Sequence, residues 1–446
     1  MARIAPFRAL RYDPDRVRVS TVVTQPYDKI TPEMQEAYYG ANPFNLVRII
    51  LGKEQVGDRR GDDTYTRAAG FFSDWRRQGV FLQDELPSIY LYVQRFTSPL
   101  SKREVERSGF IALGQLEDYS PGVVFRHEQT LAKPKADRLA LLRATRAHFG
   151  QLFMLYSDPE GEIEGLLIPQ HAPDLEICDE YRVQNRVWRI SDPGLIDLVR
   201  GKMRDKKLVI ADGHHRYETA LNYRDERRAA EKAPGKNQTD RAEIASATEE
   251  APYEQVMMTF VRMESPGLVI LPTHRVVYGL ANFSEDSLRE ASRSYFSVEE
   301  VDTSIDAERA RVILREAGRM GTALLAVTAN RVFLFDRPKV ADPGLFPAWS
   351  LRQQSLDVVQ LHQIVLENAL GLSKESIRDQ QNIRYVRDTG EALNQVRSGA
   401  ANVAFLMNPV AMHQVQDIAL AGEVLPQKST DFYPKLLSGL TIYALD

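Results

Sequence analysis

The segment Ala211-Asp212-Gly213-His214-His215-Arg216 combines residue types that bind anions. It follows an apolar run, residues 207–211, which predicts a buried strand, and a helix is expected to begin at His214 or His215. Gly213 permits a tight turn and the close approach of a ligand to the backbone. The N–H groups and the positive dipole of a first helical turn favour an anion, and the histidines and Arg216 add donors for phosphate oxygens. The segment therefore predicts a phosphate site formed by Gly213, His214, His215 and Arg216.

Asp212 has two predicted roles in this segment, as a ligand of Mg²⁺ or as a catalytic group that orients a hydroxyl. The structural alternative is that Asp212 only caps the helix and that the histidines bond to nearby carbonyls. Cations at a helix N-terminus oppose the dipole, which favours anions there. Such a local conflict is typical of a functional site, and we favour function over structure for this segment.

A second group of charged residues lies near a predicted helix at residues 134–149. It contains Arg126, His127, Glu128, Lys133, Lys135 and Arg138. The basic members are candidates for phosphate binding, but they are equally typical of a solvated helix face whose long side chains cover its own leucines. Glu128 is either a general base or an ordinary ion-pair partner.

Three further positions complete the candidate site. Asp28, in a loop after a strand, can accept a proton from a substrate hydroxyl, although a turn-forming Asp is the simpler interpretation. His274 and Arg275 follow an apolar strand, and a C-terminal loop contains Lys428, Ser429 and Thr430. Loops with such donors can close over an anion, and both segments are also compatible with ordinary turns.

Composition and missing motifs limit the function classes. The formal net charge of −4 argues against a protein that coats nucleic acid. The single cysteine, Cys178, excludes an internal disulfide and a cysteine-based zinc site. No P-loop, dinucleotide-binding fingerprint, protein-kinase signature or His-Glu-x-x-His motif is present. Because no membrane span and no secretory signal are recognised either, we expect a cytosolic protein, with a homodimer left open.

The pattern of elements predicts a mixed α/β or α+β fold. Apolar runs predict strands at residues 88–96, 109–116, 152–156 and 401–407, and an amphipathic pattern predicts a helix at 357–370. Residues 281–335 are expected to form a separate unit of helices followed by a hairpin. With 446 residues the chain is long enough for two or three domains. We predict two, a phosphate-binding domain at 1–252 and an α+β domain at 253–446.

The segment Asp-Gly-His-His-Arg-Tyr-Glu-Thr-Ala also carries a family resemblance. The chain resembles, over nearly its whole length, the bacterial family called domain of unknown function 1015. The matching stretches are residues 25–28, 126–144, 211–220, 271–275 and 426–439. The Gly-x-His-Arg core is similar to the phosphate-binding element of the ParB/sulfiredoxin-like superfamily, which includes a free-serine kinase. The resemblance implies a ParB/sulfiredoxin-like core with a large insertion and an additional C-terminal α+β region.

The resemblance and the residues together lead to one functional hypothesis. It is a kinase that transfers a phosphoryl group from ATP, ADP or pyrophosphate, with Mg²⁺, to a small hydroxylated substrate such as free L-serine. Such chemistry needs mainly an anion site, cations and a carboxylate base, here Asp28, Glu128 or Asp212. Two alternatives remain open: a nucleotide-binding or DNA-partition module, and a phosphatase or nuclease that uses the same anion site.

Overall fold

The computed structural model describes residues 1–59, 61–128, 132–232, 250–339 and 343–446. The chain forms two compact units. The first contains Met1–Arg126, Thr130–Val269 and Pro434–Asp446, and the second contains His127–Gln129 and Ile270–Tyr433. The end of the chain therefore returns to the first unit.

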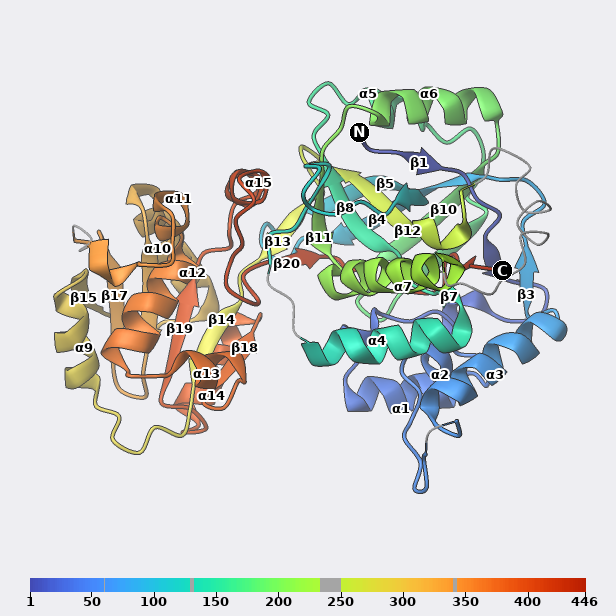
Figure 1. Ribbon diagram of the computed structural model, residues 1–446. Coiled ribbons are helices and arrows are strands. Elements are labelled where there is room, and N and C mark those ends of the chain that lie inside the picture. The colour runs from blue at the N-terminus through green and yellow to red at the C-terminus, as the bar shows by residue number, and fades with distance from the viewer. Residues whose placement is uncertain (60, 129–131, 233–249, 340–342) are drawn as a thin grey trace. The chain divides into compact units, whose positions relative to one another are not determined.

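The first unit is built on a large mixed sheet (Figure 1). Its strands follow the order β6-β11-β8-β12-β5-β4-β10-β9, and β1 also pairs with β5. The strands are β1 (Ile4–Ala5), β4 (Ile89–Thr97), β5 (Glu104–Gln115), β6 (Val124–Phe125), β8 (Leu152–Tyr156), β9 (Leu175–Cys178), β10 (Gln184–Ile190), β11 (Leu208–Asp212) and β12 (Gln255–Arg262). Two small sheets pair β2 (Leu10–Tyr12) with β3 (Phe81–Gln83) and β7 (Ala147–His148) with β21 (Tyr443–Ala444).

Both faces of the large sheet are buried. Side chains alternate between the two faces along a strand. On one face, Leu91 and Val93 of β4 belong to an apolar cluster with residues of β5, β8 and the helices α5 to α7. Tyr90, Tyr92 and Gln94 take the alternate positions on β4 and are also buried. The opposite face therefore carries polar groups inside the unit.

The helices of the first unit pack around this sheet. They are α1 (Pro32–Ala41), α2 (Val47–Ile50), α3 (Thr64–Arg77), α4 (Ala132–Thr145), α5 (Glu162–Leu166), α6 (Pro193–Met203) and α7 (His214–Lys232). Helix α4 runs alongside α7, and α3 contacts α4 from the other side (Figure 1). Thr31 caps α1, where its side chain accepts from the N–H of Met34. Short 3-10 turns occur at Val19–Thr21, Tyr27–Lys29 and Pro252–Glu254.

The second unit contains a six-stranded sheet with the order β15-β17-β16-β19-β14-β18, all in antiparallel pairs. The strands are β14 (His274–Val277), β15 (Ser297–Val301), β16 (Ala323–Val327), β17 (Val332–Asp336), β18 (Ile383–Val386) and β19 (Val403–Met407). Strand β13 (Val269–Leu271), which begins at the last residue of the first unit, pairs with β20 (Asp431–Tyr433).

The helices of the second unit include an unusual segment. They are α9 (Glu285–Arg293), α10 (Ala307–Ala317), α11 (Leu351–Gln354), α12 (Asp357–Gln360), α13 (Lys374–Arg378), α14 (Thr389–Arg397) and α15 (Met412–Leu420). Short 3-10 turns lie at Gly318–Met320 and Pro343–Leu345. The helix predicted at 357–370 is present, but Leu361–Ala369 is a π-helix that continues α12.

The sheets and helices confirm the predicted mixed α/β class, whereas the two units do not follow the predicted boundary at residue 252. Strand β12 pairs with β5 and β8, so residues 253–269 belong to the first unit. Residues 434–446 return to the same unit, where β21 pairs with β7. Among the described residues, no helix is both long and apolar enough to cross a bilayer. The ParB/sulfiredoxin-like core stays a prediction.

Candidate functional site

The turn between β11 and α7 forms the centre of the site. The pairing of β11 with β8 shifts register between Ile210 and Asp212, so the strand carries a bulge at its end. Gly213 follows with φ of +96°, and a Cβ there would lie 2.9 Å from Leu152 and 3.0 Å from the guanidinium of Arg216. Glycine is therefore required both by the backbone conformation and by the approach of Arg216. Helix α7 begins at His214, as the sequence predicted.

Asp212 is held between two cations, and we call Asp212, Arg216 and Lys435 the Asp212 cluster. Lys435 Nζ lies 3.1 Å from Asp212 Oδ1, and Arg216 Nη2 lies 2.9 Å from Asp212 Oδ2. The second η-nitrogen of Arg216 donates to the carbonyl of Gln151 at 2.6 Å. Only 8% of the Lys435 side chain is exposed, so this contact is largely shielded from solvent.

The charges around Asp212 keep its carboxylate ionised. Burial alone would raise the pKa of Asp212, but the charges of Lys435, Arg216 and Lys29 outweigh it and hold that pKa well below its usual range. Asp212 therefore stays ionised beside the positive charges of Lys435, Arg216 and Lys29. Arg216 belongs to the first turn of α7, and the first turn of a helix carries the positive end of its dipole and N–H groups without an intrahelical acceptor.

The same geometry does not fit Mg²⁺ bound directly by Asp212. The two carboxylate oxygens already accept from Lys435 and Arg216. Mg²⁺ prefers oxygen ligands, and at Asp212 it would have to displace the ammonium of Lys435 or the guanidinium of Arg216. Within the described parts of the chain, no group of three or more His, Cys, Asp or Glu side chains could hold a metal ion. The role of Asp212 as a metal ligand is therefore not supported by its donor set.

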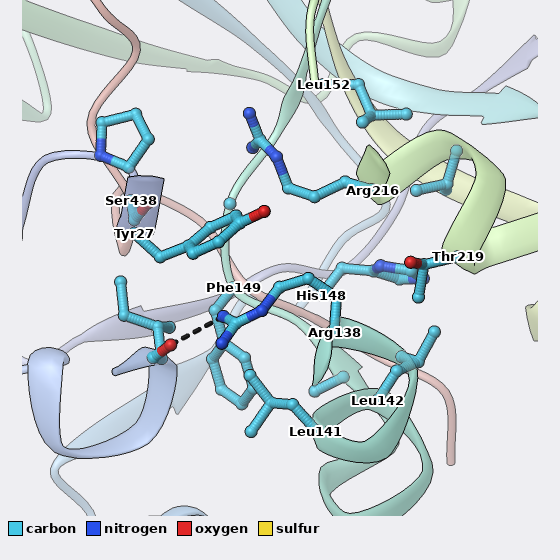
Figure 2. Close-up of a pocket in the computed structure, with 15 residues that line it drawn as sticks. Tyr27, Arg138, Leu141, Leu142, His148, Phe149, Leu152, Arg216, Thr219 and Ser438 are labelled. Carbon is cyan, nitrogen blue, oxygen red and sulfur yellow. Dashed lines mark hydrogen bonds between the residues drawn. The ribbon is translucent and has the colours of Figure 1, made fainter. Parts of the chain in front are cut away.

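A cavity adjoins the cluster, and we call it the Tyr27 pocket (Figure 2). Its volume is about 70 Å³, which leaves room for several water-sized groups and hence for one phosphate group. Tyr27 lies between Arg216 and Arg138 in the view of Figure 2. The Arg138 guanidinium stacks over the Tyr27 ring at 4.0 Å and donates to the Ile50 carbonyl at 2.7 Å. Burial and the nearby carboxylate of Asp28 raise the pKa of Tyr27 to about 12, so it is a hydrogen-bond donor at neutral pH.

The other lining residues of the Tyr27 pocket are mainly apolar. They include Leu141, Leu142 and Phe149, together with the polar Thr219 and Ser438. His148 also lines it, and burial lowers its pKa to about 4. The cationic end of the pocket is therefore formed by Arg138 and Arg216.

The basic residues predicted around residue 130 have different environments. Arg126 and Lys135 both pair with Glu218 of α7, at 3.3 and 2.8 Å. Arg138 also pairs with Asp137, and it is the member of the group that lines the Tyr27 pocket. The side chain of Lys133 lies outside the described residues. The structure thus gives Arg126 and Lys135 an ion-pair partner and brings Arg138 to the pocket.

Several other predicted residues belong to the second unit. His127 Nε2 lies 2.8 Å from Thr430 Oγ1, and the backbone N–H of Lys428 donates to Glu128 Oε1 at 3.1 Å. Lys428 adopts φ of +57°, which turns its N–H toward Glu128, and the Ser429 hydroxyl donates to the Pro426 carbonyl. The tripeptide that contains Glu128 and the loop with Lys428, Ser429 and Thr430 therefore meet within this unit.

The sequence placed His274 and Arg275 in a loop or turn after an apolar strand, whereas the structure places them within a strand. Both begin β14, where they are 1% and 0% exposed, because β14 is an inner strand between β18 and β19. His274 bonds to Thr389 and accepts from the N–H of Met407, and burial lowers its pKa to about 3. Arg275 donates to His362 of the π-helix and to the Gln427 carbonyl, and burial lowers its pKa to about 10. These residues form a polar part of the core.

The sequence did not single out several members of the site. Lys435 belongs to the C-terminal loop that the sequence marked as rich in lysine and hydroxyls, but its contact with Asp212 spans 223 residues. Tyr27 and Lys29 flank the predicted Asp28 in one 3-10 turn, and Asp28 itself is exposed. The Gln-Pro-Tyr-Asp motif was the available signal for this turn. Its proximity to Arg138 and Arg216 is a tertiary property.

The fold and the cluster define a mixed α/β protein with a cluster of charged side chains where strand β11 meets helix α7. The chain belongs to the family described as protein of unknown function (DUF1015), whose model matches residues 4–359. The predicted family is thereby confirmed. No curated protein matches the chain significantly.

Some solved structures are similar to the chain at low identity. A mutant of free serine kinase in complex with AMP has a TM-score of 0.36 at 10% identity, covering 70% of this chain and 84% of that chain. A conserved hypothetical protein from Pyrococcus furiosus has a TM-score of 0.35 at 10% identity, covering 70% and 89%. SbnI from Staphylococcus aureus, truncated at its C-terminus, has a TM-score of 0.34 at 8% identity, covering 74% and 85%.

Proposed function

We propose that this protein is a phosphotransferase that moves a phosphoryl group from ATP, ADP or pyrophosphate to a small hydroxylated metabolite. Free L-serine is the first acceptor to test. The observation that carries the proposal is the Asp212 cluster, in which a single carboxylate is shared by Lys435 and Arg216 at the start of α7. A kinase site needs cations held close together, because phosphoryl transfer depends mainly on positioning and on stabilising phosphate charge.

The phosphate groups of the donor would bind where the Asp212 cluster adjoins the Tyr27 pocket. Arg216 belongs to both, and its guanidinium is fixed by Asp212 on one side and the Gln151 carbonyl on the other. A guanidinium held in this way loses little freedom when it binds a phosphate oxygen. Lys435 and Lys29 add charge, and Gly213 leaves room at the backbone. If Mg²⁺ takes part, it would arrive with the donor phosphates, since Asp212 is not a suitable ligand.

The general base of the proposed reaction is Asp28. Asp212 is a weak proton acceptor, because its pKa is held low by Lys435 and Arg216. Asp28 is an exposed carboxylate in the same turn as Tyr27, which lines the pocket next to Arg216. Glu128, the other candidate, belongs to the second unit and bonds to the Lys428 N–H. In the proposed step, Asp28 accepts the proton of the acceptor hydroxyl as the hydroxyl oxygen attacks the terminal phosphorus of the donor. The bond between that phosphorus and the bridging oxygen breaks, and ADP, AMP or phosphate leaves from ATP, ADP or pyrophosphate respectively.

The proposal is tested with the full chain, Mg²⁺ and each of the three donors, with and without L-serine. Phosphoserine and free phosphate are both followed. We expect phosphoserine with at least one donor and its loss in Asp28→Asn. Donor hydrolysis that does not depend on any acceptor would instead identify a phosphatase. Tight donor binding without turnover over a panel of hydroxylated acceptors would identify a nucleotide-binding switch.

A further inference from the structure

A row of buried polar side chains crosses the large sheet of the first unit. Asn185 on β10 pairs with Gln94 on β4, and Gln94 pairs with Arg107 on β5, so the three residues are direct cross-strand neighbours. All three are at most 1% exposed. We call Asn185, Gln94 and Arg107 the polar row. Burying an arginine and two amides in a sheet is costly unless they form specific bonds, so the row needs a structural or functional reason.

The bonds of the polar row lead to the C-terminal segment. Gln94 Nε2 donates to the Lys435 carbonyl at 2.9 Å and to Asn185 Oδ1 at 2.9 Å. Arg107 donates to the Pro434 carbonyl at 2.5 Å and also to Gln94 Oε1. Two consecutive carbonyls, those of residues 434 and 435, are therefore fixed from the sheet.

The same row also lies close to the strands that carry the Asp212 cluster. The Arg107 guanidinium stacks over Phe153 at 4.7 Å, and Phe153 is the residue of β8 that pairs with Asp212. Fixing the Lys435 backbone at this position directs its side chain to Asp212, where Nζ lies 3.1 Å from Oδ1. A long, flexible lysine gains precision only if its backbone is held in this way.

We infer that the polar row positions Lys435 for the anion site, with Gln94 as the central positioning residue. The inference rests on the proposed function, because it assigns the row to the site that would bind the donor phosphates. Gln94 acts through Lys435 and does not itself touch the donor. Removing its amide should therefore weaken anion binding only as long as Lys435 is present.

The test is a double-mutant cycle between Gln94→Met and Lys435→Met in the full chain, with pyrophosphate as the probe. We expect Gln94→Met alone to weaken pyrophosphate binding by about 5- to 10-fold and to have less than about a twofold effect in the Lys435→Met background. Tyr90→Phe is the matched control. Tyr90 is on the same strand and the same sheet face, is equally buried, and bonds to Asp84 and Phe7. The Tyr90→Phe variant should have a lower free energy of unfolding and an unchanged affinity for pyrophosphate.

A second readout separates this inference from the proposed function. The ¹³Cε resonance of Lys435, assigned by its loss in Lys435→Met, should shift in Gln94→Met and stay unchanged in Tyr90→Phe. If wild-type protein binds no pyrophosphate, the proposed anion site fails, and this resonance alone decides whether the row positions Lys435. An unshifted resonance, or equal effects of Gln94→Met with and without Lys435, would overturn the inference.

Discussion

Replacing Lys435 with methionine should weaken the anion site without unfolding the chain. Methionine keeps an unbranched apolar stem of similar length but removes the charge that lies 3.1 Å from Asp212. A hydrogen bond to a charged group contributes about 1.5–3 kcal/mol, and each 1.4 kcal/mol is a factor of ten in affinity. If Lys435 contacts a phosphate group as it contacts Asp212, pyrophosphate affinity should fall about 10- to 100-fold. Asp212 keeps Arg216 as a partner, so folding is expected to survive.

The assay is isothermal titration calorimetry with pyrophosphate at low and high salt, after thermal unfolding has verified that the variant is folded. The wild-type affinity should fall with salt more steeply than that of the variant, because the variant offers one cation less. Lys202→Met is the matched control, since Lys202 pairs with Glu162 in an exposed contact that contributes little. A folded Lys435→Met protein with wild-type affinity would refute the assignment of the anion site.

The other predictions concern both units. Arg216→Ala removes the second cation of the Asp212 cluster and should weaken pyrophosphate binding by about 10-fold or more in calorimetry, whereas unchanged affinity would contradict the site. Asp28→Asn should lower kcat for phosphoserine formation more than it lowers donor affinity, whereas Glu128→Gln should leave kcat unchanged. The reverse pattern would identify Glu128, in the second unit, as the general base. Burial raises the pKa of Asp357 from 3.8 to about 7, so the native state keeps a proton that the unfolded state releases. Stability of the second unit should therefore fall as pH rises from about 4 to 7. Asp357→Asn should reduce the fall in melting temperature between pH 4 and pH 7, whereas Asp417→Asn, at an exposed position, should leave that fall unchanged. An equal fall in the two variants would refute the assignment to Asp357.

The sequence alone was enough to predict the strand–turn–helix unit at residues 208–220. Its signals are local: an apolar strand, a glycine where the backbone has positive φ, and a helix start. The buried strand at Leu152–Tyr156 was predicted at its observed bounds for the same reason. The family resemblance was likewise carried by short motifs, and the family model confirms it.

The environments of the charged side chains could not be predicted in this way. The sequence placed His274 and Arg275 in a loop or turn after a strand, but they belong to β14, which pairs with two neighbours, and they are buried. Glu128 and Asp212 looked like alternatives within one site, but they belong to different units. Which side chains a strand buries depends on its neighbours in the sheet, and those neighbours are distant in sequence.

The sequence by itself was enough to predict the family and the mixed α/β class, and it led to the proposal that residues 211–216 bind an anion. Only the tertiary structure showed that Lys435 contacts Asp212 and that Gln94 and Arg107 donate to the carbonyls of residues 435 and 434. It also decided that Arg126 and Lys135 pair with Glu218 while Arg138 reaches the Tyr27 pocket. The physical reason is that backbone conformation follows from local residue types, whereas charge pairing depends on contacts that form when distant segments pack together.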